Sequence, residues 1–214
     1  MNKVKNKRKK PKLELLAPAG DMSMLVSAVN AGADSVYLGL KDFNMRATAK
    51  NFSVDDLKES RKICDKKGVK IYLTMNTIMY PEEVKQIEKI LPKVKKYIDA
   101  IICWDISVVE LCKKNKIPFH ISTQASISNV EAAKFYKKIG AERVVLAREL
   151  NLKQIKEIVK KVPGLEIETF IHGAMCVSIS GRCFMSQHLF RKSANRGECL
   201  QPCRRAYTIK DDDG

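Results

Sequence analysis

The chain has 214 residues, of which 45% are hydrophobic, so it can bury a complete core, and a single domain is the default expectation. No run of about 18 apolar residues occurs, which excludes a membrane-spanning helix. The net charge is +16, and removing the seven basic residues among the first twelve still leaves +9, which suits RNA or DNA as a partner, although a merely lysine-rich surface explains the charge equally well.

Short apolar runs alternate with segments of helical periodicity from residue 13 onward. Capping residues and glycines stand at most of the joints between them. In chain order, the sequence predicts a strand at 13–19, a helix capped by Asp21, a strand at 34–38, a helix capped by Ser53, a strand at 69–75, a helix starting at Pro81, a strand at 99–103, a helix opened by Ser107, a strand at 118–121, a helix opened by Ser128, a strand at 143–147, a helix from Asn151 and a strand at 166–171.

This alternation indicates an α/β fold of parallel strands covered by helices, and the absence of a glycine-rich dinucleotide turn favours a (β/α) TIM-like barrel. Such a barrel has eight units, whereas seven are visible here, so we expect an incomplete barrel and a chain truncated from a longer protein. The expected domains are a disordered basic tail at 1–12, the barrel at 13–175, a cysteine-rich segment at 176–207 packed on the barrel mouth, and a short tail at 208–214.

Barrel enzymes place their active sites at the C-terminal ends of the strands. Asp105, Gln124 and His172 follow predicted strands here and are the catalytic candidates. For Asp105, helix capping or a surface ion pair explains its position as well as a catalytic role does. His172 can instead orient a loop. Other polar side chains at these ends are Tyr37, Arg46, Asn76, Arg148 and Glu149.

Four of the seven cysteines fall within 28 consecutive positions, at Cys176, Cys183, Cys199 and Cys203. Thiolates clustered in this way bind soft metals or iron–sulfur clusters. Only the last pair has the spacing of a zinc knuckle, so the irregular intervals favour an iron–sulfur cluster, with zinc as the alternative. An odd number of cysteines without an export signal indicates a reducing, cytoplasmic compartment. We expect Cys64, Cys103 and Cys112 to pack in the core.

Four stretches carry a family resemblance: 16–21 (LAPAGD), 31–39 (AGADxVYxG), 168–186 with its ExFxHGAMC and SGxCxMS motifs, and 193–204 (SANRGECLQPCR). At these residues the sequence resembles the collagenase-like peptidases, the U-type peptidases of unknown catalytic type, over residues 13–207. The 193–197 stretch is most similar to the branch of prephenate-dependent tRNA and rRNA hydroxylases.

The resemblance implies a 4Fe-4S cluster on Cys176, Cys183, Cys199 and Cys203, and prephenate as a candidate co-substrate. It also adds Glu168 of the motif to the catalytic candidates. The expected activity is hydroxylation of a tRNA or rRNA base. The alternatives are a peptidase and a cluster-bearing, non-catalytic subunit that needs a paralogous partner. The basic side chains expected to contact RNA are Arg182, Arg191, Lys192, Arg196, Arg204 and Arg205.

Overall fold

The computed structural model describes residues 13–45, 49–208 and 210–211, so the expected basic tail at 1–12 and the candidate Arg46 lie outside the described residues, as does most of the 208–214 tail. Seven strands form one parallel sheet in the order of the sequence. They are β1 (Leu16–Pro18), β2 (Ser35–Gly39), β3 (Lys70–Met75), β4 (Ala100–Cys103), β5 (Phe119–Ile121), β6 (Arg143–Val145) and β7 (Glu166–Glu168).

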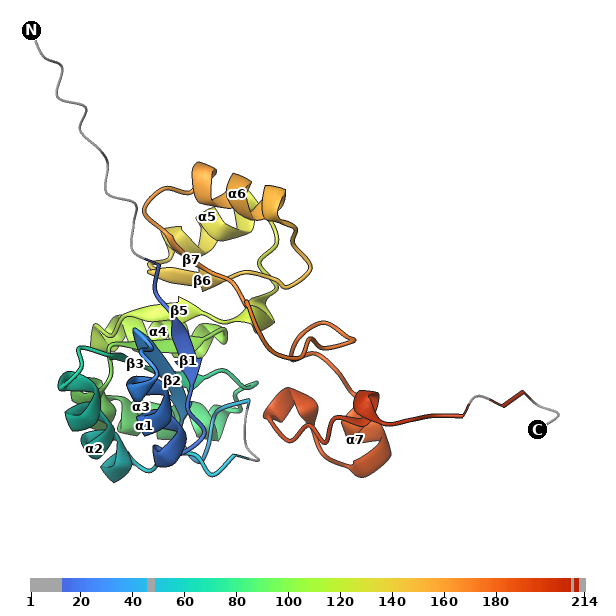
Figure 1. The fold of residues 1–214 in the computed structure, drawn as a ribbon, viewed down its shortest axis with the longest axis horizontal. Helices are drawn as coiled ribbons and strands as arrows, with labels where there is room; N and C mark the ends of the chain where they lie inside the picture. Colours follow the sequence, from blue (N-terminus) through green and yellow to red (C-terminus); the bar gives the residue numbers. More distant parts are fainter. Residues whose placement is uncertain (1–12, 46–48, 209, 212–214) are drawn as a thin grey trace, which may run out of the picture.

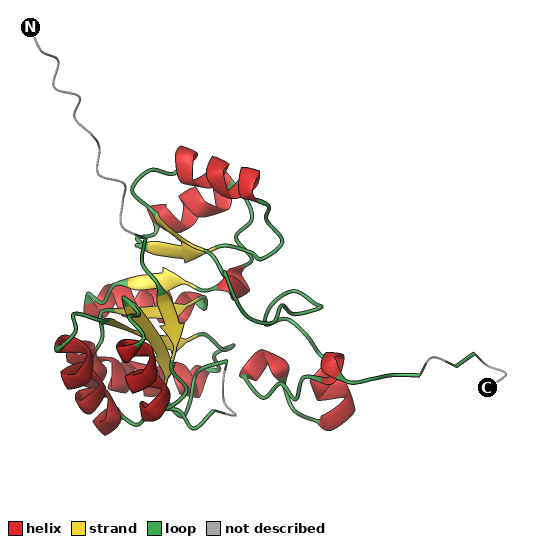
Figure 2. Cartoon of the chain, in the orientation of Figure 1, coloured by secondary structure: helices red, strands yellow, loops and turns green. Residues whose placement is uncertain are grey.

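Helices follow the first six strands and cover the outside of the curled sheet (Figures 1 and 2). These helices are α1 (Met22–Asn30), α2 (Val54–Asp65), α3 (Pro81–Val94), α4 (Ile106–Asn115), α5 (Val130–Lys138) and α6 (Leu152–Lys161). After β7 the chain runs out to one side and carries α7 (Met185–Phe190). The expected (β/α) architecture is confirmed as a seven-stranded half-barrel. Within the described ranges, no helix is long and apolar enough to cross a membrane.

Helix starts show how local sequence sets these elements. Asp21 accepts a hydrogen bond from the Met24 amide at 2.9 Å, and Ser53 and Asp56 form the reciprocal capping box expected of them. Two predicted starts are wrong, because α4 is capped by Asp105 instead of Ser107, and α5 by Asn129 instead of Ser128. Aspartate, asparagine and serine cap helices about equally well, so adjacent candidates cannot be separated by residue type.

The main core lies between the sheet and the helices. Leu25, Leu57 and Leu91 are fully buried there. The apolar stripe expected on α3 is confirmed by the buried Ile87, Leu91 and Val94, whereas the stripe expected on α6 is wrong at Leu152 and Val159, which are exposed. Cys64, Cys103 and Cys112 are also fully buried, as expected for cysteines that pack as small hydrophobes. Burial raises the pKa of the Cys64 thiol to about 11, so this thiol stays protonated at neutral pH.

Ion pairs link the two edges of the open half-barrel near the N-terminal ends of its strands. Arg143 of β6 donates from its two terminal nitrogens to the two carboxylate oxygens of Glu14, at 2.9 Å each, and it also pairs with Glu166. Tyr72 of β3 donates its hydroxyl to Glu14 at 2.7 Å. Burial opposes ionisation of Glu14, but the hydrogen bonds from Arg143, Tyr72 and Ser35 lower its pKa to about 2. In the part of the chain that is described, no ladder joins β1 to β7, and this cluster links the two sides instead.

The seventh strand is shorter than predicted. It ends at Glu168, whereas the sequence indicated a strand to residue 171. Its ladder partner β6 has only three residues, so the last apolar residues of the predicted run have no neighbouring strand to pair with, and Phe170 and Ile171 are exposed. The chain therefore leaves the sheet early, and His172 lies on the exposed segment that follows.

Candidate active site at the barrel mouth

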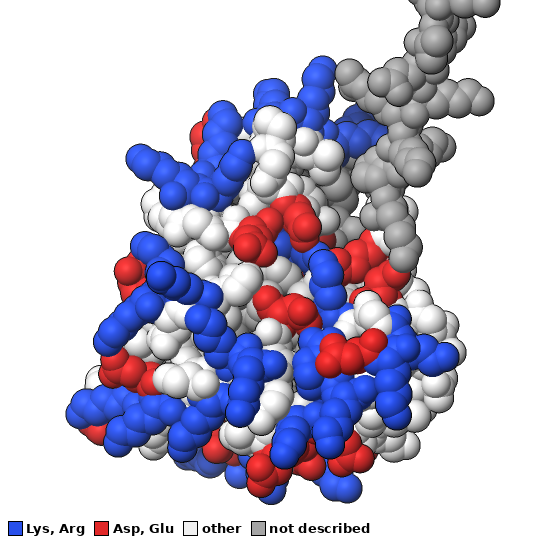
Figure 3. Space-filling view, turned by 90° about the vertical axis from the view of Figure 1, so that its left-hand side faces the viewer, with Lys and Arg blue, Asp and Glu red and all other residues white. Residues whose placement is uncertain are grey.

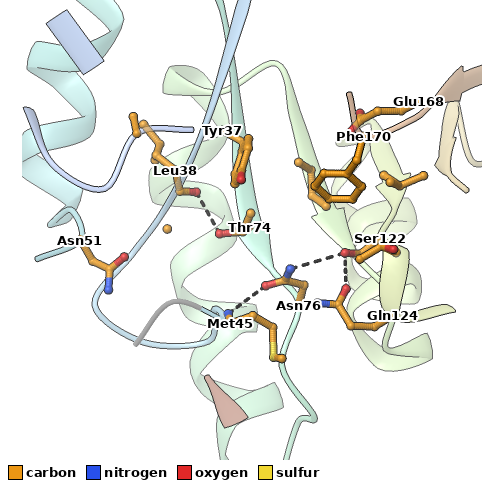
Figure 4. Close-up of a pocket in the computed structure, with 15 residues that line it drawn as sticks. Tyr37, Leu38, Met45, Asn51, Thr74, Asn76, Ser122, Gln124, Glu168 and Phe170 are labelled. Carbon is orange, nitrogen blue, oxygen red and sulfur yellow. Dashed lines mark hydrogen bonds between the residues drawn. The ribbon is translucent and has the colours of Figure 1, made fainter. Parts of the chain in front are cut away.

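A cavity of about 210 Å³ opens at the C-terminal ends of the strands (Figure 4). Barrel folds place their active sites at this end. The walls combine apolar side chains with polar ones, among them the carboxyl group of Glu168, which is typical of pockets that bind small organic groups. The lining residues are Ala19, Tyr37, Leu38, Gly39, Met45, Asn51, Thr74, Asn76, Ile102, Ser122, Thr123, Gln124, Val145, Glu168 and Phe170.

One side of the pocket is a network of buried polar side chains, seen at the bottom of Figure 4. The Asn76 amide oxygen accepts from the Met45 backbone at 3.1 Å, and its nitrogen donates to the Ser122 hydroxyl at 3.4 Å. Ser122 in turn donates to the Gln124 amide oxygen. Trp104 fixes the Asn76 backbone by donating to its carbonyl at 2.9 Å. Two side-chain amides are therefore held in place at the pocket wall.

Glu168 contributes a carboxylate to the same pocket. Burial raises its pKa, although Arg143, with a terminal nitrogen 3.5 Å from one oxygen, partly offsets this effect. A carboxyl group with a raised pKa exchanges a proton more readily near neutral pH.

His120 of β5 is buried two residues before the pocket-lining Ser122, and its ring packs edge-on against Tyr72 with centroids 4.6 Å apart. Burial and the charge of Arg143 lower the pKa of His120 to about 3, so the imidazole is neutral. Among the described residues, its Nδ1 has no hydrogen-bond partner.

Residues 169–208, which we call the cysteine arm, contact this pocket directly. Arg182 donates to the Gln124 carbonyl at 3.2 Å and lies 5.3 Å above the Trp104 ring. Gly181 has φ +74°, and a Cβ atom at this position would come within 2.5 Å of Gln124 Cγ. Only glycine therefore fits at this position of the arm, where the backbone approaches the pocket wall.

A second contact holds the start of the arm. Arg148, three residues after the end of β6, donates to the carbonyls of Gly173 and Ala174 at 3.0 and 2.6 Å and stacks over the Phe170 ring at 4.7 Å. The segment that leads into Cys176 is thus tied to the barrel by an arginine that the sequence placed at a strand end.

The four cysteines of the arm are free thiols. Cys176, Cys199 and Cys203 are exposed, and Cys183 is half-buried. The Gln201 amide donates to Cys199 Sγ at 3.4 Å, and the Cys183 amide donates to Asn195 at 2.8 Å.

Four accessible thiols on one short segment match a four-cysteine iron–sulfur site in ligand type and number. They are not gathered into one site, because within the described residues no three His, Cys, Asp or Glu side chains lie close enough to hold a metal ion. Holding a cluster would therefore require the arm to draw its thiols together.

The catalytic candidates separate into two groups. Gln124 and Glu168 both line the pocket, whereas Asp105 and His172 do not. The Asp105 carboxylate accepts from the Ser107 amide at 2.9 Å and the Ser107 hydroxyl at 2.6 Å, which makes it the cap of α4. Strand-end position alone did not distinguish these two groups. The candidates that it missed are Thr74 and Ser122, and their signal was a hydroxyl residue at the end of an apolar strand.

Several basic side chains expected to contact RNA make contacts within the chain. Arg196 pairs with Glu83, Arg204 donates to the Met175 carbonyl at 2.5 Å, and Arg205 stacks over the Phe190 ring at 4.6 Å. Lys192 lies 3.4 Å from Glu198, and Arg191 is exposed at the C-terminus of α7. Elsewhere, Figure 3 shows lysine and arginine spread over one face with carboxylates among them.

Known proteins are similar to this chain in sequence and in fold. The chain is 43% identical over 212 residues to a collagenase of Porphyromonas gingivalis, covering 94% of this chain and 51% of the relative. It is 41% identical over 209 residues to tRNA hydroxylation protein P1 of Bacillus subtilis, covering 96% and 49%. The chain thus spans about half the length of these curated relatives.

The solved structure of the U32 peptidase Mk0906 superposes with a TM-score of 0.62 at 13% identity, covering 76% of this chain and 70% of that one, which shows a shared fold. The family model of peptidase family U32 matches residues 20–214. This match extends over β2 to β7, the pocket lining from Tyr37 onward and the cysteine arm. The chain therefore belongs to peptidase family U32.

Proposed function

We propose that this protein takes part in hydroxylating a base of tRNA or rRNA, with the base held in the barrel-mouth pocket. The observation that carries the proposal is the contact between Gly181 and Gln124, because it joins the segment bearing the cysteines to a polar pocket wall. A relative at 41% identity is named a tRNA hydroxylation protein, which supports RNA as the substrate class.

Within the pocket, the residues present suit a planar heterocycle. The amides of Asn76 and Gln124 can pair with the polar edge of a base, and Phe170 offers an aromatic face for stacking. Glu168, with its raised pKa, is placed to hold or release a proton at the base. The positive charge of the chain favours approach of the RNA backbone.

The cofactor of this proposal is a 4Fe-4S cluster held by Cys176, Cys183, Cys199 and Cys203, with zinc as the alternative metal. A bound cluster supplies one-electron chemistry. Prephenate is the proposed co-substrate. Its carboxylates need positive partners, and Arg182 is exposed beside the pocket wall where it contacts Gln124.

The test compares modified nucleosides in RNA from a deletion strain and from the same strain complemented with this gene or its variants. We expect a hydroxylated nucleoside to disappear on deletion, return with the wild-type gene, and stay absent with Gln124→Ala or Cys176→Ser. Glu82→Gln, which changes an exposed residue whose ion pair among the described residues is with Lys85, is the matched control and should restore the nucleoside. Identical nucleoside profiles with and without the gene would refute the proposal.

Peptide hydrolysis is the second candidate, favoured by the relative named collagenase. In the described part of the pocket, the Ser122 hydroxyl is bonded to Gln124 and Asn76, and no histidine or lysine lines the cavity beside it as a general base. Cleavage of denatured collagen that persists in the Cys176→Ser protein and is lost in Ser122→Ala would favour this candidate. If neither activity is found without a second protein, the non-catalytic subunit becomes the better reading.

A further inference from the structure

Arg196 on the cysteine arm contacts three residues of the barrel. Its guanidinium donates to both carboxylate oxygens of Glu83, at 2.8 and 2.5 Å, and to the Ile78 carbonyl. It also lies 4.3 Å above the Tyr80 ring. A two-pronged arginine–carboxylate contact with stacking fixes both distance and orientation, which a lysine cannot do.

The barrel side of this contact is rigid. Glu83 lies in the first turn of α3, and its carboxylate also accepts from the Tyr80 amide at 2.8 Å, so it caps the helix while it binds Arg196. Helix α3 is anchored by Ile87 and Leu91, both fully buried. The hydrogen bond from Arg196 lowers the pKa of Glu83 and keeps the carboxylate charged at neutral pH.

On the arm side, Arg196 belongs to a tight turn at residues 193–198. The amides of Arg196 and Glu198 both donate to the Ser193 carbonyl, at 3.1 and 3.0 Å. The buried Asn195 in this turn accepts from the Cys183 amide at 2.8 Å, and Cys199 follows the turn directly. One turn therefore governs the backbone at two of the four thiols.

We propose that Glu83 and Arg196 form a latch that positions the 193–198 turn, and with it Cys183 and Cys199, over the barrel mouth. Both are positioning residues that act through the turn. Cys176 depends on a different contact, the one between Arg148 and the carbonyls of Gly173 and Ala174. The latch thus controls part of the arm and leaves the segment before Cys176 in place. Its value for catalysis rests on the proposed function.

The test uses the full chain as purified and measures trypsin cleavage after Lys192 and alkylation of each cysteine by iodoacetamide, read by peptide mass spectrometry. Glu83→Gln keeps an acceptor for the Tyr80 amide but removes the charge. We expect cleavage after Lys192 and alkylation of the half-buried Cys183 to rise about fivefold or more, whereas Cys176 and Cys199, which are already exposed, should change little. Glu82→Gln on the same helical turn is the control and should match the wild type.

Two further variants test whether the residues act as a pair. Arg196→Lys should give an intermediate rise, and the double variant Glu83→Gln/Arg196→Lys should rise no further than the larger single effect. Unreactive Cys64, Cys103 and Cys112 show that the barrel remains folded. Unchanged reactivity in Glu83→Gln, or an equal rise at all seven cysteines, would overturn the latch. A normal arm profile with no RNA hydroxylation counts against the proposed function and leaves the latch standing.

Discussion

At the scale of single residues, the contact between arm and barrel depends on a missing side chain. Gly181 has a left-handed backbone, and the space beside it is taken by Gln124. Gly173 has a left-handed backbone as well, with φ +107°, but nothing lies within 4 Å of where its Cβ would be. Substituting these two glycines therefore distinguishes the effect of backbone strain, which both positions share, from that of a steric clash, which occurs only at Gly181 of the two.

We expect Gly181→Ala to lower RNA hydroxylation by about tenfold or more, because strain of about 1 kcal/mol combines with displacement of Gln124. Gly173→Ala carries the strain without the clash and should lose much less activity. The measurement is the hydroxylated nucleoside content of RNA from complemented deletion strains. Equal losses in the two variants would show that fit against Gln124 is unimportant.

Burial of Glu168 reduces the stability of the protein at neutral pH, although the proposed function needs this carboxyl group in the pocket. Its folded-state pKa lies above its unfolded value, so its charged form is disfavoured on folding, and the stability of the protein falls as pH rises from the unfolded pKa towards the folded one.

Glu168→Gln removes this titration while keeping the shape of the side chain. The variant should therefore be at least as stable as wild type at neutral pH in thermal unfolding, yet lose most hydroxylation. A variant that is clearly less stable than wild type at neutral pH would show that the pair with Arg143 dominates.

At the scale of elements, a charge cluster joins the two sides of an open sheet. Arg143 is buried against Glu14, Glu166 and Glu168, so removing it leaves carboxylates facing one another. Arg143→Met should destabilise the protein by about 3–5 kcal/mol, the range for breaking a buried pair. Urea unfolding measures this, and Lys114→Met, which removes an exposed pair with Glu88, should leave the midpoint unchanged.

The same cluster predicts how the barrel responds to acid. Glu14 has a folded pKa of about 2 against an ordinary value of 4.5. A lowered carboxyl pKa gives stability that is fully present above 4.5 and is lost as pH falls towards 2. Glu14→Gln should therefore flatten the pH dependence of urea unfolding in this window. An unchanged slope would mean that other carboxylates control acid unfolding.

At the scale of the whole molecule, the barrel and the cysteine arm have separate sources of stability. The buried core lies between sheet and helices, whereas most apolar side chains of the arm are exposed, among them Phe170, Val177 and Phe184. Changes in the arm should therefore leave barrel stability intact.

Protein purified without oxygen should be brown and absorb near about 400 nm, as iron–sulfur proteins do. Cys176→Ser should lose most of this absorbance and the bound iron, with thermal unfolding of the barrel little changed. Stoichiometric zinc in a colourless wild-type protein would replace the cluster by the alternative metal.

Much of the fold could be predicted from the sequence because its causes are local. The alternation of apolar runs with helical stripes, the caps at Asp21, Ser53 and Asn151, and the start of α3 at Pro81 each depend on residues a few positions apart. These determine a parallel (β/α) architecture before any tertiary contact is considered. The density of cysteines in the arm is likewise a property of the sequence alone.

Only the tertiary structure decided which strand-end side chains share a pocket, and it assigned Asp105 to a helix cap instead. It also decided that Glu14 meets Arg143, 129 positions away, and that Arg196 meets Glu83, 113 positions away. Such contacts arise when separate elements pack together. The types and local spacing of these residues do not indicate which distant residue each will contact. The barrel could therefore be predicted from the sequence, whereas the charge cluster around Arg143, the pocket and the latch could not.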